Sequence, residues 1–124
     1  MDGLKQTLEV VRETAFAIHV YLGHGHLERI YENCLVHRLK KLGIDVQQQV
    51  PLDVFDQDGF LLGRYVADLF VGGSILVEIK TAKALAREHE GQVLAYLRSC
   101  RLEHGLLINF GSFRFEIRKY ANFL

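Results

Sequence analysis

The spacing of apolar residues changes at Gly43, and this change constrains the possible folds more than any other feature of the chain. Before Gly43, apolar side chains recur every three or four residues over residues 2–22 and again over about 26–42. This spacing predicts two amphipathic helices. The glycines on either side of His24 interrupt the pattern between the two helices, and Asp2 is a suitable N-cap for the first.

After Gly43, apolar residues mostly alternate with polar ones, which is typical of β-strands. Strands are predicted over residues 46–54, 64–71, 75–80, 105–110 and 113–119, with a third helix over about 83–100. Val46, Val50 and Leu52 share one parity, so the first strand is expected to bury one face. Pro51 cannot donate to a ladder, so this strand is expected to be an edge strand or an irregular one. The order α-α-β-β-β-α-β-β predicts a single α/β (α+β) domain over residues 1–124, with helices packed on a mixed sheet.

The composition fits one globular domain and gives no global sign of a partner. The chain has 124 residues, 49% of them hydrophobic, which suits a single domain. Lys plus Arg equals Asp plus Glu at 15 each, so the net charge of zero does not favour nucleic acid, a membrane or an acidic partner. No segment approaches the ~20 unbroken apolar residues of a membrane span, and the first residues lack the pattern of a signal peptide. We therefore expect a cytoplasmic protein with no membrane partner.

The two cysteines show no spacing typical of a metal or redox centre, and the histidines offer a single closely spaced pair. Cys34 and Cys100 are far apart in the sequence and are expected to be small buried side chains. His24 and His26 are spaced so that they could bind a transition metal, but no third ligand lies nearby in the sequence. The glycines beside them are expected instead to allow a sharp turn before the second helix.

Two carboxylates are predicted to face each other in the hairpin that joins the second and third strands. If residues 72–74 form a three-residue loop, Asp68 lies opposite Glu78 with Cβ atoms roughly 5 Å apart. Like charges in this position destabilise a sheet, whereas a divalent cation such as Mg²⁺ would offset their repulsion. Lys80 lies on the same face. The alternative is an exposed salt-bridge cluster, and a one-residue change of register would separate the two acids.

The second and third helices carry polar side chains that could join this pair. Glu28 falls in the predicted apolar stripe of the second helix, which also contains Tyr31 and Leu42, and a buried carboxylate there needs a partner. Alternatively, Glu28 lies at the solvated N-terminal end of the stripe. Gln92 and Tyr96 share a face of the third helix with His89, and this face either orients a polar ligand or is solvated.

Two motifs resemble those of known nucleases. Asp68, followed ten residues later by Glu78-Ile79-Lys80, resembles the signature of the PD-(D/E)XK phosphodiesterases. Residues 25–31, Gly-His-Leu-Glu-Arg-Ile-Tyr, resemble the motif that names the GxxExxY protein family, a single-domain branch of that superfamily. The resemblance extends over about residues 8–118. One departure is that Ala67, rather than the proline of the signature, precedes the aspartate.

The resemblance implies a restriction-endonuclease-like core and a role for each matching residue. It assigns catalytic roles to Glu28, Asp68, Glu78, Lys80 and Gln92, and supporting roles to Tyr31 and Tyr96. Asp68, Glu78 and the Ile79 carbonyl would hold Mg²⁺, with Mn²⁺ as a substitute, and Glu28 would be a further ligand or an acceptor beside the ligands. The metal would polarise the phosphate and help to generate hydroxide. Lys80 and Gln92 would orient water and phosphate oxygens.

The resemblance therefore favours a metal-dependent phosphodiesterase, a nuclease that acts on DNA or RNA. The alternatives are a non-catalytic module that binds nucleic acid or protein, and a hydrolase of small phosphorylated molecules. Arg114, Glu116 and Arg118 are typical of the wet face of an edge strand, which could pair with a second copy to form a homodimer. The small size of the chain leaves substrate specificity to such a dimer or to a protein partner.

Overall fold

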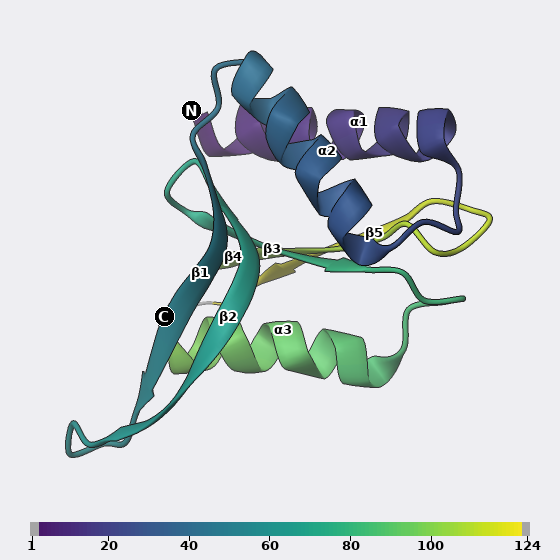
Figure 1. Cartoon of the computed structure of the whole chain (residues 1–124). Coiled ribbons are helices and arrows are strands. Elements are labelled where there is room, and N and C mark those ends of the chain that lie inside the picture. Colours follow the sequence, from purple (N-terminus) through teal and green to yellow (C-terminus); the bar gives the residue numbers. More distant parts are fainter. Residues whose placement is uncertain (1–2, 123–124) are drawn as a thin grey trace.

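The five strands form one mixed sheet in a computed structural model that describes residues 3–122 (Figure 1). The elements in chain order are α1 (Gly3–Leu22), α2 (Glu28–Lys41), β1 (Val46–Phe55), β2 (Leu61–Val71), β3 (Ile75–Lys80), α3 (Arg87–Ser99), β4 (His104–Asn109) and β5 (Glu116–Ala121). The strands lie in chain order across the sheet, and only β3 and β4 run parallel. The predicted order and mixed sheet are confirmed, and β1 is an edge strand as Pro51 indicates. The predicted N-cap Asp2 lies outside the described residues.

Helices cover both faces of the sheet, with α1 and α2 on one face and α3 on the other (Figure 1). The larger core joins α1 and α2 to three side chains of β3, which are Ile75, Val77 and Ile79. The smaller core joins α3 to Leu76, on the opposite face of the same strand. Because side chains alternate along a strand, Glu78 and Lys80 also face α3. None of the helices in the described part of the chain is long and apolar enough to span a bilayer.

Along β1 and β2, the buried side chains switch from one face of the sheet to the other. Val46 and Leu69 pack in the larger core, whereas Val50 and Ala67 pack against the smaller core on the other face. The change occurs at Gln49, which has a left-handed φ of +55° and no partner in the pairing of β1 with β2. One left-handed residue interrupts the two-residue alternation of a strand. The prediction of one continuous buried face for β1 is therefore wrong.

Tyr31 fixes the connection between α1 and α2. Its ring stacks on Phe110 with centroids 4.6 Å apart. Its hydroxyl donates to the Gly23 carbonyl at 2.6 Å and accepts from the His26 amide at 3.2 Å. The chain before α2 is held by these bonds, and the helix begins at Glu28, two residues later than predicted.

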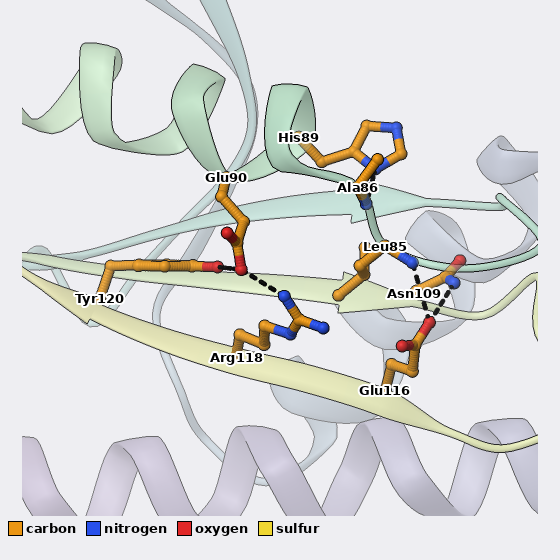
Figure 2. Close-up of polar contacts among 8 residues, drawn as sticks. All are labelled: Leu85, Ala86, His89, Glu90, Asn109, Glu116, Arg118 and Tyr120. Carbon is orange, nitrogen blue, oxygen red and sulfur yellow. Dashed lines mark hydrogen bonds and ion pairs between the residues drawn. The ribbon is translucent and has the colours of Figure 1, made fainter.

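Helix α3 begins at Arg87, later than predicted, because side chains hold the segment between β3 and α3 as a loop. The Asn109 amide group donates to the Ala82 carbonyl at 2.9 Å and accepts from the Ala82 amide at 3.0 Å. The Glu116 carboxylate accepts from the Leu85 amide at 3.1 Å and from Asn109 at 2.9 Å (Figure 2). These partners satisfy backbone groups that would otherwise need a helical hydrogen bond.

Strand β5 begins at Glu116, three residues later than predicted, because the chain after β4 packs as a loop. Gly111 lies so close to the backbone of the preceding loop that a Cβ atom would stand 2.3 Å from the Thr81 carbonyl carbon and 2.6 Å from the Ala82 nitrogen. Phe113, predicted as a strand residue, is 85% exposed. The alternation of apolar and polar residues therefore continues beyond the end of the real strand.

Gly111→Ala is expected to destabilise the protein by about 2–3 kcal/mol, because the new methyl group overlaps backbone that cannot move without breaking the Asn109 bonds. Urea unfolding monitored by circular dichroism measures the change. Gly91→Ala in α3 is the matched control, since nothing lies within 4 Å of its added Cβ. The control should gain about 0.5–1 kcal/mol from helix propensity. Equal stability of Gly111→Ala and the wild type would contradict the packing argument.

Candidate active site

The ladder between β2 and β3 ends at the pair Leu69 and Val77, and the next facing residues are Asp68 and Glu78. Side chains replace the backbone pairing at this point. The Asp68 amide donates to Glu78 Oε2 at 2.9 Å, and the Ile79 amide donates to Asp68 Oδ2 at 2.7 Å. The predicted register and the proximity of the two carboxylates are thus observed, but each carboxylate is held by the other strand's backbone.

Helix α3 brings two of the predicted side chains to Lys80. The Lys80 ammonium donates to Gln92 Oε1 at 2.9 Å, and Gln92 Nε2 lies 3.0 Å from the Tyr96 hydroxyl. The Tyr96 ring stacks on Tyr65 of β2, with centroids 4.2 Å apart. His89 does not join this group, because its Nδ1 accepts from a backbone amide at the start of α3. Of the polar face predicted for this helix, Gln92 and Tyr96 therefore belong to the site, whereas His89 caps the start of the helix.

Glu28 approaches the site from the first residue of α2. The residue is exposed, which agrees with the alternative of a solvated N-terminal position rather than burial in the apolar stripe. Its carboxyl group is nevertheless partly withdrawn from water and lies near Asp68, and both effects raise its pKa. Lys80 and the Thr81 amide act in the opposite direction. Leu42, predicted in the same stripe, lies beyond the last turn of α2 and is exposed.

The carboxylate that α2 buries is Glu32, which sequence reasoning did not identify. Glu32 is only 6% exposed, and its oxygens accept from Gln48 Nε2 at 2.6 Å and from Gln49 Nε2 at 3.0 and 3.1 Å. The Gln49 side chain also lies beside Asp68 and acts to lower the pKa of that aspartate. One amide side chain, that of Gln49, therefore lies between the buried acid of α2 and the acid of β2.

A signal for these missed residues is present in the sequence. Glu32 lies four residues after Glu28, so both occupy the same side of the helix. Residues 47–49 are three consecutive glutamines in a predicted strand, where such polar side chains are uncommon. The sequence pattern does not reveal the left-handed conformation of Gln49, which turns its side chain toward the acids. Strained backbone of this kind is concentrated at functional sites.

The electrostatics of the site are those of crowded acids with one nearby ammonium group. Burial, and then the charge of Asp68, raise the pKa of Glu78 to about 8. Burial also raises the pKa of Asp68, and the neighbouring Glu32 adds to the increase. Lys80 acts to lower both pKa values but does not cancel the effect of burial. The site therefore favours a proton or a cation between its carboxylates.

The chemistry of these groups fits a hard divalent cation. Asp68 and Glu78 each use only one oxygen in the backbone hydrogen bonds that hold them. Within residues 3–122, no three His, Cys, Asp or Glu side chains are gathered into a complete ligand set. Mg²⁺ does not need one, because it is commonly held by one or two carboxylates together with water and substrate phosphates. Asp68 and Glu78 are thus suitable ligands, with Glu28 nearby. That the Ile79 carbonyl is a further ligand stays a prediction.

Glu78→Gln is expected to change how the stability of the protein depends on pH. The pKa of the Glu78 carboxyl group is 4.5 in the unfolded chain and about 8 in the folded protein. Between pH 4.5 and pH 8, the folded protein therefore keeps a proton on this group that the unfolded chain has released. Wild-type stability contributed by this group is fully present below pH 4.5 and is lost as the pH rises through 8. The difference in Tm between Glu78→Gln and the wild type should therefore be more favourable to the variant at pH 8.5 than at pH 5. A pH-independent difference in thermal melts would contradict the raised pKa.

Comparisons with known proteins agree with this geometry. A family model described as the PD-(D/E)XK nuclease superfamily matches residues 5–120. The fold is similar to that in the crystal structure of SSO0001, with a TM-score of 0.63 and 21% sequence identity. This similarity covers 78% of our chain and 51% of that chain, so our chain spans about half the length of that protein. No curated protein matches the sequence. The mixed sheet with its flanking helices is thus a restriction-endonuclease-like fold, and the chain belongs to the PD-(D/E)XK nuclease superfamily.

Proposed function

We propose that this chain is a metal-dependent nuclease of the GxxExxY branch that hydrolyses phosphodiester bonds of DNA or RNA. The observation that carries the proposal is the arrangement of Asp68 and Glu78 where the ladder between β2 and β3 ends. Lys80 lies two residues after Glu78 on β3. Superfamily membership supports phosphodiester chemistry at this position. The proposal requires the carboxylates to bind the metal and the ammonium group to face the phosphate.

The contacts of residues 25–31 support membership of the GxxExxY branch. Gly25 has a φ of +112°, a conformation that glycine adopts far more readily than other residues. Tyr31 binds the backbone of the same turn through its hydroxyl. Glu28 lies between these two and approaches Asp68. The three residues that name the motif thus act together to direct one carboxylate toward the site.

In the proposed mechanism, the carboxylates hold the metal and the other polar groups orient the reactants. When bound, Mg²⁺ or Mn²⁺ polarises the scissile phosphate and makes a bound water more acidic. Asp68 and Glu78 supply oxygen ligands, and Glu28 accepts a hydrogen bond beside them. Lys80, held by Gln92, offsets negative charge on the phosphate and orients the attacking water. Hydrolysis breaks one P–O bond: the water oxygen adds to phosphorus and loses a proton, and the leaving oxygen gains one.

Tyr96 and Glu32 are positioning residues in this proposal. Tyr96 binds Gln92 and so limits the rotamers from which Gln92 can hold Lys80. Glu32 fixes Gln49, which in turn lies beside Asp68. Their loss should therefore reduce the rate through the geometry of groups that touch the phosphate.

A nuclease assay with Asp68→Asn and Lys80→Ala tests the proposed function. The substrates are single-stranded, double-stranded and branched DNA and RNA, each with Mg²⁺, Mn²⁺ or EDTA. We expect metal-dependent cleavage by the wild type and a loss of roughly 100-fold or more in each variant, because each change removes one charged group from the transition state. Asp53→Asn is the matched control, since Asp53 lies in the same sheet but pairs with Arg64 at the surface. Equal cleavage by Asp68→Asn and the wild type would contradict the assignment.

We also propose that two copies can pair through the open edge of β5. The prediction that Arg114 lies on this strand is wrong, because β5 begins at Glu116. The Arg118 side chain pairs with Glu90 of the same chain, so the pairing would use the strand's backbone groups (Figure 2). The structure offers β5 as one edge of the sheet, with Arg118 exposed and Glu116 partly exposed. Light scattering after gel filtration should then give twice the mass of the chain. A monomer mass at micromolar concentration would contradict the homodimer and would leave specificity to a different protein partner.

A further inference from the structure

Three loops meet at the end of the sheet where β3 ends with Lys80. Residues 81–86 follow Lys80 directly, and residues 110–115 lie against them at Gly111. Residues 23–27 approach from the other side, where the His24 ring meets the Phe113 ring with centroids 6.2 Å apart at an angle of 82°. All three loops project from the same end of the molecule (Figure 1).

The loop that carries Phe113 is anchored on both sides of this residue. Ser112 is buried, and its carbonyl accepts from His19 Nε2 at 2.9 Å. Its hydroxyl donates to the Arg114 carbonyl. Before it, Asn109 connects the loop to the segment after β3 and to the Glu116 carboxylate (Figure 2). Phe113 is therefore held in an exposed position by fixed backbone, with one contact to an aromatic side chain.

These loops and the adjoining helix starts are positively charged although the whole chain is neutral. Within residues 23–29, 81–88 and 111–114, the exposed charged side chains are four cations and two carboxylates, namely Arg29, Lys83, Arg87, Arg114, Glu28 and Glu88. The whole chain, by comparison, has 15 of each sign. A polyanion is therefore attracted to this end of the molecule.

Another group of exposed apolar side chains has the opposite surroundings. It lies at the end of the β1–β2 hairpin and consists of Phe55, Phe60, Leu61 and Leu62. Asp56 and Asp58 lie between them in the sequence, and a phosphate backbone would be repelled there. An exposed aromatic ring in cationic surroundings thus distinguishes the Phe113 end from the hairpin end.

We propose that Phe113 and His24 form a stacking platform for an unpaired nucleobase next to the scissile phosphate. The proposal rests on the proposed function and gives its substrate class, which is DNA or RNA that is single-stranded at the site of cleavage. A base stacks on an aromatic ring through its face, and in a duplex both faces are covered by neighbouring bases. The T-shaped contact with His24 holds the Phe113 ring while leaving it 85% exposed. The cations of the three loops bind the phosphates on either side of the stacked base.

Binding of a short single-stranded DNA that contains one 2-aminopurine tests the platform, with EDTA present so that no cleavage occurs. Stacking quenches the fluorescence of this base. At fixed salt concentration, Phe113→Ala should weaken binding at least about fivefold and reduce the quenching. Phe113→Trp should retain both, whereas Phe113→Leu, which keeps an apolar side chain without the aromatic ring, should lose the quenching. Phe60→Ala is the matched control, because it removes a similarly exposed ring from the acidic hairpin end.

The outcomes separate the platform from the proposed nuclease activity. Binding and quenching that are unchanged in Phe113→Ala would overturn the platform, even if wild-type protein cleaves with Mg²⁺. Loss of binding in Phe113→Ala with a wild type that never cleaves would support the platform and overturn the nuclease. Equal losses on the single strand and on a blunt duplex would overturn the choice of substrate class. Circular dichroism melts of each variant ensure that weaker binding does not reflect unfolding.

Discussion

Two hydrogen bonds from backbone amides to carboxylates, exchanged between β2 and β3, hold the centre of this structure together. Where the ladder stops, the amides of Asp68 and Ile79 would be left without partners, and an unpaired amide in the sheet is costly. The carboxylates of Glu78 and Asp68 satisfy them. The same contacts that close the gap in the sheet therefore fix the two acids, so that their positions follow from the backbone rather than from flexible side chains.

The opening of the ladder also explains the features around it. Because the strands separate, Gln49 of the neighbouring strand can turn its side chain toward Asp68, at the cost of a left-handed backbone. Helix α2 then meets this region with Glu32 buried against Gln49 and with Glu28 near the surface. With Gln92 of α3, acids, amides and one ammonium group converge from five elements. Amide groups donate hydrogen bonds to the buried carboxylates and so reduce the free-energy cost of burying them, but they do not neutralise the negative charge.

Sequence patterns identified the elements and the central pair but not the departures from regular structure. The spacing of Asp68 and Glu78 around a short loop was sufficient to predict their proximity, because hairpin register is set by loop length. Glu32 was missed since helical periodicity does not distinguish a buried acid from a solvated one when its partners lie on a distant strand. Phe113 was assigned to a strand because it continues the alternation of β5, whereas the close packing of Gly111 ends that strand early. Local periodicity carries no information about such contacts.

The loop after β3 has no regular secondary structure, yet its amides are not independent of one another. Those of Ala82 and Gly111 donate to the side chain of Asn109, and that of Leu85 donates to Glu116. Exchange of these amide hydrogens with solvent therefore requires the β4–β5 turn to open, and they become accessible together. The chain that follows the site is thus part of the same cooperative unit as the last two strands, with a local unfolding free energy closer to that of the sheet than to that of an ordinary loop.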